Sequence, residues 1–394
     1  MSKETGLRLA VIISDGIRGH VNQSRGVASW LSRRTGAEVL ELEIPQLKGI
    51  RRFNARKGAA KLTDGNRRTA LEWIGKAEGN DAAEILRQRL LERGIHEERT
   101  SSLIFISAGS MPAFYNLALG HIWRCPCVTI MTPSVIGIEP FDFAIVPEHD
   151  YPRKAPNVMT TVGAPNLIVR EELELLGKFL LREYPPKRER RWGILLGGDD
   201  KNYKVTASWI HKIIGEIFRE AECGNADLYI STSRRTSPEA ESALKRMASG
   251  HENVRFMLVA SVDQFNPISA MLGACGEIFV TEDSVNMVSE TATAGHRAVL
   301  LRTERAGGAL KKTLQDATRI MVSSGLLPPR ALWGVPRFDL TFESFSNMGL
   351  LIDFGDWLHE RRHGDLTPVC RLDDGTGGFN EARRAADWIL SKIK

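Results

Sequence analysis

The stretch EIFVTEDSVNMVSETATAGHRAVLL, residues 277–301, decides the fold class. Its first apolar run predicts a short buried strand at 278–280, and the polar and small residues that follow predict a helix at 285–294. A second apolar run predicts another strand at 298–301. Because a helical crossover returns the chain in the same direction, we expect the two strands to lie parallel in one sheet.

The same alternation of apolar runs and helical patterns extends over most of the chain. It predicts further strands at 7–14, 38–44, 103–107, 128–131, 143–146, 158–162, 192–196, 228–231 and 254–259. Predicted helices lie at 22–34, 66–77, 82–93, 111–120, 171–182, 205–221, 237–248 and 266–274. Alternating strands and helices are typical of parallel α/β domains in which helices cover both faces of the sheet.

The segment REYPPKRERRWG, residues 182–193, is the best candidate for a linker, because two prolines and a run of charges interrupt the alternation. It predicts an N-terminal domain at 1–184 and a second α/β domain at 191–330. The remaining tail, 331–394, is less regular, although 379–394 carries the apolar stripe of an amphipathic helix.

Composition narrows the class of protein only slightly. The chain has 394 residues, of which 42% are apolar and 26% charged, as in ordinary soluble globular proteins. The net charge of +5 permits an anionic ligand, a nucleic acid or an acidic membrane surface without selecting one. No segment interleaves aromatic and basic residues, so we expect no nucleic-acid partner.

The expected location is cytoplasmic. The sequence has neither a signal-peptide pattern nor a run of 18 apolar residues. Its five scattered cysteines, Cys370 among them, do not form the framework of a secreted disulfide-rich protein, which favours reduced thiols.

Residues that follow the predicted strands matter most, because open α/β sheets bind ligands outside the carboxyl ends of their strands. After the first strand, SDGIRGHVNQSRG places Asp15, Gly16, Gly19 and His20 at the start of a helix, where free N–H groups suit an anion. The glycines permit a tight turn, and His20 or Asp15 could act as a base. A purely structural alternative stays open, namely a glycine-rich turn capped by Asn22.

The sequence GGDDKNY follows the strand at 192–196. Backbone amides of Gly197 and Gly198 could cradle a phosphate. The adjacent Asp199 and Asp200 would repel a phosphate unless they point away, so an ordinary turn and helix cap is an equal alternative.

Two arginines, Arg234 and Arg235, follow the strand at 228–231, with Ser233 directly before them. Guanidinium groups at the end of a strand suit a diphosphate or a carboxylate. The SPEAE sequence that comes next is explained by helix initiation alone.

The polar start of the TEDSVNMVSE segment fits a helix cap made by Asp283 or Ser284. Glu290 lies further along the same helix among small and apolar side chains, where a carboxylate could accept two hydrogen bonds from a ribose diol. We therefore take Thr281, Asp283, Ser284, Met287 and Glu290 as candidate nucleotide-binding residues.

Several common catalytic motifs are missing from the sequence. It has no Walker A, GxSxG or HExxH motif and no full GxGxxG with a distal acid, which argues against the enzyme classes that use them. Cysteines and histidines do not recur at ligand spacing, so no metal site is expected.

Taken together, SDGIRGHVNQSRGVA, VPEHD, VGAPN, LLGGDD, TSRRTSPE and VTEDSVNMVSETATAG resemble the mitochondrial-fission (elongated-mitochondria) protein family, which has bacterial members. The motifs follow the family's order over about residues 8–303. That family is similar to GT-B glycosyltransferases, so the resemblance implies two Rossmann-like domains with parallel sheets facing a central cleft. It further implies an acceptor-side or catalytic role for His20, a ribose contact for Glu290, and a last helix that returns to the first domain.

The resemblance leaves three features unexplained. They are the basic helical segment 51–99, the tail after residue 325, and the pair Asp199–Asp200 where a polar phosphate loop is more usual.

The function that this resemblance favours is inverting transfer from a nucleotide diphosphate sugar to an unidentified acceptor. His20 or Asp15 would act as the base, and Arg234 and Arg235 would stabilise the leaving diphosphate. No metal or other cofactor is expected, because the arginines and a helix dipole can neutralise the phosphates.

Two other functions remain open. The first is a nucleotide-sugar epimerase, which needs no acceptor. The second is a non-catalytic adaptor on the same scaffold, with 51–99, Trp333 and Trp357 as candidate contacts. Peripheral association with a membrane is compatible with each of them.

Overall fold

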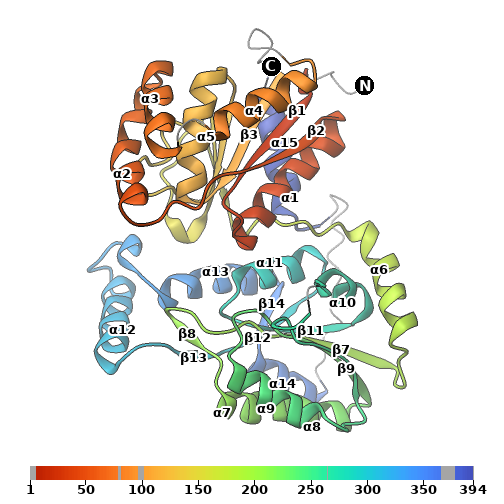
Figure 1. The fold of residues 1–394 in the computed structure, drawn as a ribbon. Helices are drawn as coiled ribbons and strands as arrows, with labels where there is room; N and C mark the ends of the chain where they lie inside the picture. The colour runs from red at the N-terminus through yellow and green to blue at the C-terminus, as the bar shows by residue number, and fades with distance from the viewer. Residues whose placement is uncertain (1–5, 79–80, 96–101, 264, 365–377, 394) are drawn as a thin grey trace. The chain divides into compact units, whose positions relative to one another are not determined.

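A computed structural model describes residues 6–78, 81–95, 102–263, 265–364 and 378–393, so Cys370 lies outside the described residues. The chain forms two compact units. The N-terminal unit comprises Met1–Leu167 together with Asn380–Lys394, and the C-terminal unit comprises Ile168–Phe379. Each unit has its own parallel sheet and its own core (Figure 1).

The sheet of the N-terminal unit has six parallel strands in the order β2-β1-β3-β4-β5-β6. These strands are β1 (Leu9–Ser14), β2 (Glu38–Glu43), β3 (Leu103–Ala108), β4 (Cys127–Ile130), β5 (Phe143–Pro147) and β6 (Val158–Thr161). Every residue of β1 and β3 is buried, because helices cover both faces of the sheet.

The helices of this unit form two layers on opposite faces of the sheet. They are α1 (Arg18–Thr35), α2 (Gly49–Ala59), α3 (Arg67–Glu78), α4 (Asp81–Glu92), α5 (Ser110–Trp123) and α15 (Glu381–Lys392), with the 3-10 turns η1 (Ala60–Asp64) and η3 (Glu148–Asp150). Alternate residues of β1 point to opposite faces. Val11 and Ile13 pack in the core with α3, α4 and α5, whereas Ile12 packs in the core with α1 and α15.

The last helix, α15, is part of the N-terminal unit and lies beside α1 (Figure 1). Trp388 meets Phe143 edge-on with 5.4 Å between ring centroids. On the exposed side, Asp387 accepts hydrogen bonds from the guanidinium of Arg34. The amphipathic stripe of this helix therefore completes the core on one face of the N-terminal sheet.

The sheet of the C-terminal unit also has six parallel strands, in the order β10-β9-β7-β11-β12-β14. They are β7 (Arg190–Leu195), β9 (Ala226–Ser231), β10 (Val254–Leu258), β11 (Glu277–Thr281), β12 (Ala298–Leu301) and β14 (Leu351–Asp353). The short strands β8 (Tyr203–Lys204) and β13 (Glu304–Arg305) form a separate antiparallel pair.

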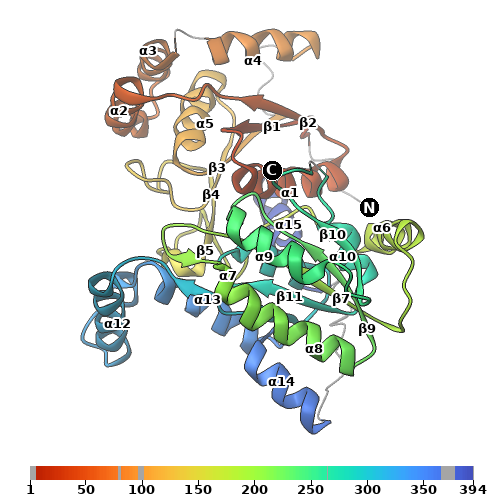
Figure 2. The same ribbon diagram turned by 60° about the horizontal axis from the view of Figure 1, so that its bottom comes forward.

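Helices cover this second sheet as well. They are α6 (Arg170–Glu183), α7 (Ala207–Trp209), α8 (Gly215–Cys223), α9 (Pro238–Ala248), α10 (Ile268–Ala274), α11 (Val285–Thr293), α12 (Ala309–Ser323), α13 (Val335–Asn347) and α14 (Phe354–His363), with the π-helix η4 (Ile210–Ile214) and the 3-10 turn η5 (Pro329–Ala331). Figure 2 shows α8 and α9 lying together. Trp192 at the centre of the sheet packs in one core with residues of α8, α9 and α14.

The predicted fold class, two parallel α/β units, is confirmed, but the tail is more regular than its sequence predicted. Three prolines between 327 and 345 suggested irregular structure, yet Pro336 lies in the first turn of α13, where proline lacks no helical hydrogen bond. The strand β14 is only three residues long and pairs with β12 as the sixth strand of the sheet. Its short length left no clear period in the sequence.

The division between the units lies before α6, whereas the sequence suggested 1–184 and 191–330 as domains. Two glycines explain where α6 packs. A Cβ on Gly177 of α6 would stand 2.4 Å from the carbonyl carbon of Gly273, just within α10. The helices therefore approach at backbone distance, a pairing that no local sequence pattern predicts. No helix within the described residues is long and apolar enough to cross a membrane.

Candidate functional site

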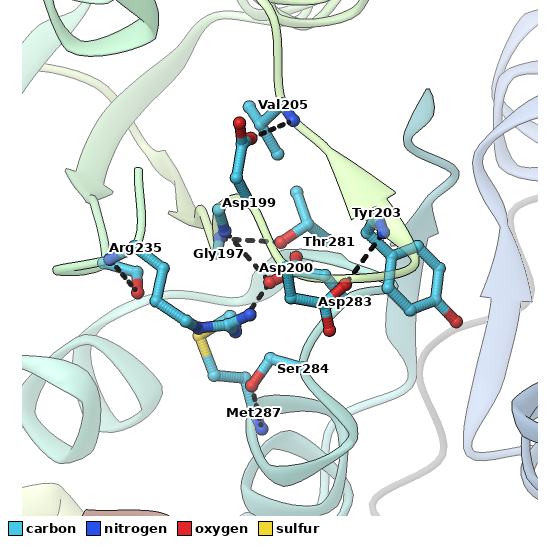
Figure 3. A network of polar contacts seen from close by, with 12 residues as sticks. Gly197, Asp199, Asp200, Tyr203, Val205, Arg235, Thr281, Asp283, Ser284 and Met287 are labelled. Carbon is cyan, nitrogen blue, oxygen red and sulfur yellow. Dashed lines mark hydrogen bonds and ion pairs between the residues drawn. The ribbon is translucent and has the colours of Figure 1, made fainter. Parts of the chain in front are cut away.

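The candidate site of the C-terminal unit lies at the carboxyl ends of β9, β7 and β11, which are neighbours in the sheet. The loops that follow these strands carry Arg235, Gly197–Gly198 and Thr281–Ser284, and polar contacts join all three loops (Figure 3). The structure thus brings together three of the segments that the sequence marked as candidates.

The two glycines of the loop after β7, Gly197 and Gly198, allow very close contact with the other two loops. Gly197 donates its N–H to the hydroxyl of Thr281 at 2.7 Å, and Gly198 donates to Oδ2 of Asp283 at 2.9 Å. A Cβ on Gly197 would stand 2.0 Å from the Asp283 carboxylate, and one on Gly198 would stand 2.1 Å from the backbone carbonyl of Arg235. Both N–H groups that could have cradled a phosphate are therefore bonded inside the protein.

The carboxylate of Asp283 holds the loops together. Its side chain is fully buried and accepts a hydrogen bond from Nη2 of Arg235 at 2.7 Å. Burial raises the pKa of Asp283, an effect that donors including Arg235 oppose only in part. Of the two possible helix caps, Ser284 is the one used, because its Oγ accepts from the N–H of Met287 at 3.4 Å.

We expect Asp283→Ala to lower the free energy of unfolding by roughly 1–3 kcal/mol, because the buried N–H of Gly198 loses its acceptor. Chemical denaturation would measure the change. Ser284→Ala, in the adjacent position, removes a helix cap and serves as a control at about 1 kcal/mol. A smaller effect for Asp283→Ala than for Ser284→Ala would contradict the role assigned to this carboxylate.

The acidic pair Asp199–Asp200 shapes its own loop (Figure 3). Oδ1 of Asp199 accepts from the N–H of Val205 at 2.9 Å. Oδ1 of Asp200 accepts from the N–H groups of Asn202 at 2.6 Å and Tyr203 at 2.8 Å. These acids are therefore explained by the turn between β7 and β8.

The loop after β9 fixes the backbone of its arginines. Ser233 accepts from the N–H of Arg235 at 3.2 Å, and its own N–H donates to Oγ1 of Thr236 at 3.0 Å. The Thr236 hydroxyl donates to the carbonyl of Gly197. Arg234 is exposed, and its guanidinium has no ion-pair partner in the part of the chain that the structure describes. Thr236 was not among the candidates, because a threonine beside two arginines gives no signal of its own.

Glu290 is the most unusual side chain of the C-terminal unit. It lies in α11, is only 8% exposed, and forms no hydrogen bond or ion pair with any described residue. Burial raises the pKa of Glu290 to about 7. The neighbouring hydroxyls of Ser289 and Thr291 donate to carbonyls of their own helix. Buried carboxylates normally have partners, so this one is suited to a ligand.

The N-terminal unit contains a second candidate site, formed by Asp15 and His20. Oδ2 of Asp15 lies 2.9 Å from Nδ1 of His20, and Oδ1 accepts from the N–H of Ile17 at 3.1 Å. A carboxylate can only accept, so Nδ1 carries a hydrogen, and in the neutral imidazole Nε2 keeps its lone pair. In this geometry His20 can accept a proton at Nε2.

The helix that carries His20 begins earlier than predicted. It begins at Arg18, with Ile17 as a cap residue that uses no side-chain hydrogen bond. The structural alternative in which Asn22 caps the helix is therefore wrong, and Gly19 lies inside α1. Asp15 instead bonds the N–H of Ile17 in the turn that precedes the helix.

Two glycines shape the backbone at this site, and one of them lies against the ring of His20. Gly16 has φ +72°, in the left-handed region that favours glycine. Gly109, at the end of β3, has φ +87°, and a Cβ there would stand 2.5 Å from Cε1 of His20. Gly109 was missed at the sequence level, although a glycine directly after a buried strand is a signal of close approach.

A sequence model of the mitochondrial fission ELM1 family matches residues 18–393. The chain belongs to this family. The match confirms the resemblance that the motifs suggested. No protein with curated annotation matches this ELM1-family chain.

Solved structures show how the ELM1-family chain is folded. UDP-GlcNAc 2-epimerase from Methanocaldococcus jannaschii matches with a TM-score of 0.53 at 10% identity, over 98% of this chain and 99% of that chain. UDP-GlcNAc 2-epimerase from Neisseria meningitidis gives 0.49 at 12% identity, over 97% and 98%. MurG from Acinetobacter baumannii gives 0.45 at 12% identity, over 98% and 99%. The chain therefore has the expected GT-B-like fold, with two six-stranded parallel sheets.

Within the ranges that the structure describes, no three His, Cys, Asp or Glu side chains are placed to hold a metal ion.

Proposed function

We propose that this ELM1-family protein binds a nucleotide sugar through its C-terminal unit and transfers the sugar to an acceptor hydroxyl. The observation that carries the proposal is the buried Glu290 carboxylate, which no described residue satisfies. The fold is compatible with this activity but does not by itself assign it.

Glu290 selects the kind of ligand. A buried carboxylate gains most from neutral hydroxyl donors that reach both of its oxygens, and it repels phosphate. The 2′- and 3′-hydroxyls of a ribose supply such a pair of donors. Glu290 therefore suits the nucleoside part of a ligand rather than its phosphates.

The diphosphate would be bound by Arg234 and Arg235. The N–H groups of Gly197 and Gly198 are bonded inside the protein, so positive charge has to come from side chains. Arg235 is oriented by its ion pair with Asp283, and Arg234 is exposed. Because negative charge accumulates on the diphosphate as it leaves, such guanidinium groups stabilise the transition state more than the ground state.

The acceptor would be activated by the Asp15–His20 pair. The acceptor oxygen forms a bond to the anomeric carbon of the sugar, while the bond from that carbon to the diphosphate breaks. The acceptor proton passes to Nε2 of His20, and Asp15 stabilises the resulting imidazolium through Nδ1.

Product analysis tests this function. The protein would be incubated with UDP-GlcNAc, the nucleotide sugar in the name of the matched epimerase, and with other nucleotide sugars, and the products separated and weighed by mass spectrometry. Release of the nucleoside diphosphate with sugar on a hydroxyl is the expected result, and it should be lost in Glu290→Ala. An isomer of unchanged mass would instead show an epimerase, and no turnover of any donor would favour an adaptor.

A further inference from the structure

The helix α2 presents an unusually basic and apolar surface. Residues 48–61 contain no acid. Their six cations are all exposed, and none has an ion pair with a described residue: Lys48, Arg51, Arg52, Arg56, Lys57 and Lys61. Two large apolar side chains are exposed among them, Ile50 at 76% and Phe53 at 63%. We call these eight residues the α2 surface.

The opposite side of α2 is fixed to the core of the N-terminal unit. Ala55 and Ala59 are buried in that core, and the indole N–H of Trp73 in α3 donates to the carbonyl of Ala55 at 2.9 Å. This attachment decides which face of α2 is turned to solvent. Figure 1 shows α2 beside α3, which in turn packs against α5.

Helical geometry places the two apolar side chains of the α2 surface on one ridge. At 100° per residue, Ile50 and Phe53 fall on the side opposite Ala55 and Ala59. Lys57 lies on the same ridge. Arg56 falls on one flank of it, whereas Arg51 and Arg52 fall nearer the buried side, next to Ala55 and Ala59 respectively.

A second exposed apolar pair, on α6, offers a comparison with α2. In α6, Leu175 is 72% and Phe179 is 70% exposed. That helix carries Glu171, Glu172 and Glu174 near the pair, and Lys178 is ion-paired with Glu174, so its surroundings are of mixed charge and not basic. The α6 pair matches α2 in apolar exposure and differs in charge.

We propose that the α2 surface docks this protein on an anionic lipid bilayer. Ile50 and Phe53 enter the boundary between headgroups and acyl chains, and the flanking cations bind lipid phosphates. Lysine and arginine side chains have long apolar stems, so they can reach the headgroups while α2 lies along the surface. A nucleic acid fits less well, because the apolar side chains of Ile50 and Phe53 would then contact charged phosphates.

Co-sedimentation of the full chain with vesicles tests the proposal. We expect binding to phosphatidylcholine vesicles that contain 30% phosphatidylglycerol, at least tenfold above binding to pure phosphatidylcholine, and loss of most of it in 0.5 M NaCl. Arg52→Gln with Arg56→Gln should weaken partitioning by about 30-fold, which is about fivefold for each cation. Ile50→Ser with Phe53→Ser should weaken it at least tenfold.

The matched control is Leu175→Ser with Phe179→Ser, which removes equal apolar exposure from α6 and should leave vesicle binding unchanged. Circular dichroism would show that each variant is folded. Equal binding to neutral and anionic vesicles would overturn the proposal. Undiminished vesicle binding by the Ile50→Ser, Phe53→Ser variant would also overturn it. So would binding of the wild-type protein to duplex DNA as tight as its binding to anionic vesicles, because either result indicates a general polyanion site.

Discussion

Glu290→Gln should make the protein more stable at pH 8 by about 3 kcal/mol. The carboxyl group is buried without a partner, and its pKa is about 7 instead of the ordinary 4.5. This difference corresponds to about 3 kcal/mol that the folded state loses when Glu290 ionises. A glutamine of the same shape remains neutral, so it avoids that cost.

The raised pKa of Glu290 lowers the stability of the wild-type protein only over a defined range of pH. Between pH 4.5 and about 7 the folded state holds a proton on Glu290 that the unfolded state has released, so this group lowers stability as pH rises through that interval. Below pH 4 both states are protonated, and wild type and Glu290→Gln should be equally stable. Urea unfolding at pH 4, 6 and 8 would measure the divergence.

A buried glutamate with partners provides the control. Glu282, in the same sequence stretch, accepts from Nη1 of Arg302 at 3.0 Å and from the N–H of Thr303 at 2.7 Å. Burial raises the pKa of Glu282 too, but Arg302 and Thr303 stabilise its ionised form, so Glu282→Gln should gain less stability at pH 8 than Glu290→Gln. Parallel pH profiles for wild type and Glu290→Gln would contradict the view of Glu290 as an unsatisfied ligand group.

Asp15→Asn should reduce the rate of sugar transfer by about 10²–10⁴-fold. An amide N–H facing Nδ1 of His20 would donate to it, which places the ring hydrogen on Nε2 and removes the base. In the opposite amide orientation, the NH₂ group of Asn at position 15 would face the N–H of Ile17, so two donors would meet without an acceptor. Steady-state release of the nucleoside diphosphate would measure the loss.

Two controls separate catalysis from folding and binding in this experiment. Nucleotide affinity should be unchanged, because Asp15 and Glu290 belong to different compact units. His20→Asn should cost about as much as Asp15→Asn, and the double variant should be no worse than His20→Asn, since the pair acts as a unit. The two residues do not share this role if the rate loss of the double variant equals the product of the two single losses. Activity of either single variant within twofold of wild type would show the same.

The sequence predicted the fold better than it predicted the site. Buried strands such as β1 and β11 appear as apolar runs, and their parallel arrangement follows from the helices between them. By contrast, the packing of α6 on α10 depends on Gly177 and Gly273 meeting across nearly a hundred positions. Pairings at that separation leave no periodic signal.

The polar residues of the site show a similar limit. The position of Glu290 on the helix after β11 was evident in the sequence, but its isolation depends on which side chains surround it. Asp283 and Ser284 were equal candidates for the cap, and only the position of Gly198 decides that Asp283 bonds another loop. Asp199 and Asp200 carry charges that argued against phosphate, yet their carboxylates bond their own turn.

Calorimetric titration with nucleoside diphosphates at pH 6 and pH 8, for wild type and Glu290→Gln, tests the central claim most directly. With a pKa of about 7, Glu290 is ionised in about a tenth of molecules at pH 6 and in most at pH 8. For wild type we predict saturable nucleotide binding that is several-fold to tenfold tighter at pH 8 than at pH 6. For Glu290→Gln we predict affinity at least tenfold weaker at pH 8, with no difference between the two pH values. Equal affinity of the two proteins at both pH values, or no binding of any nucleotide, would contradict a nucleotide site at Glu290.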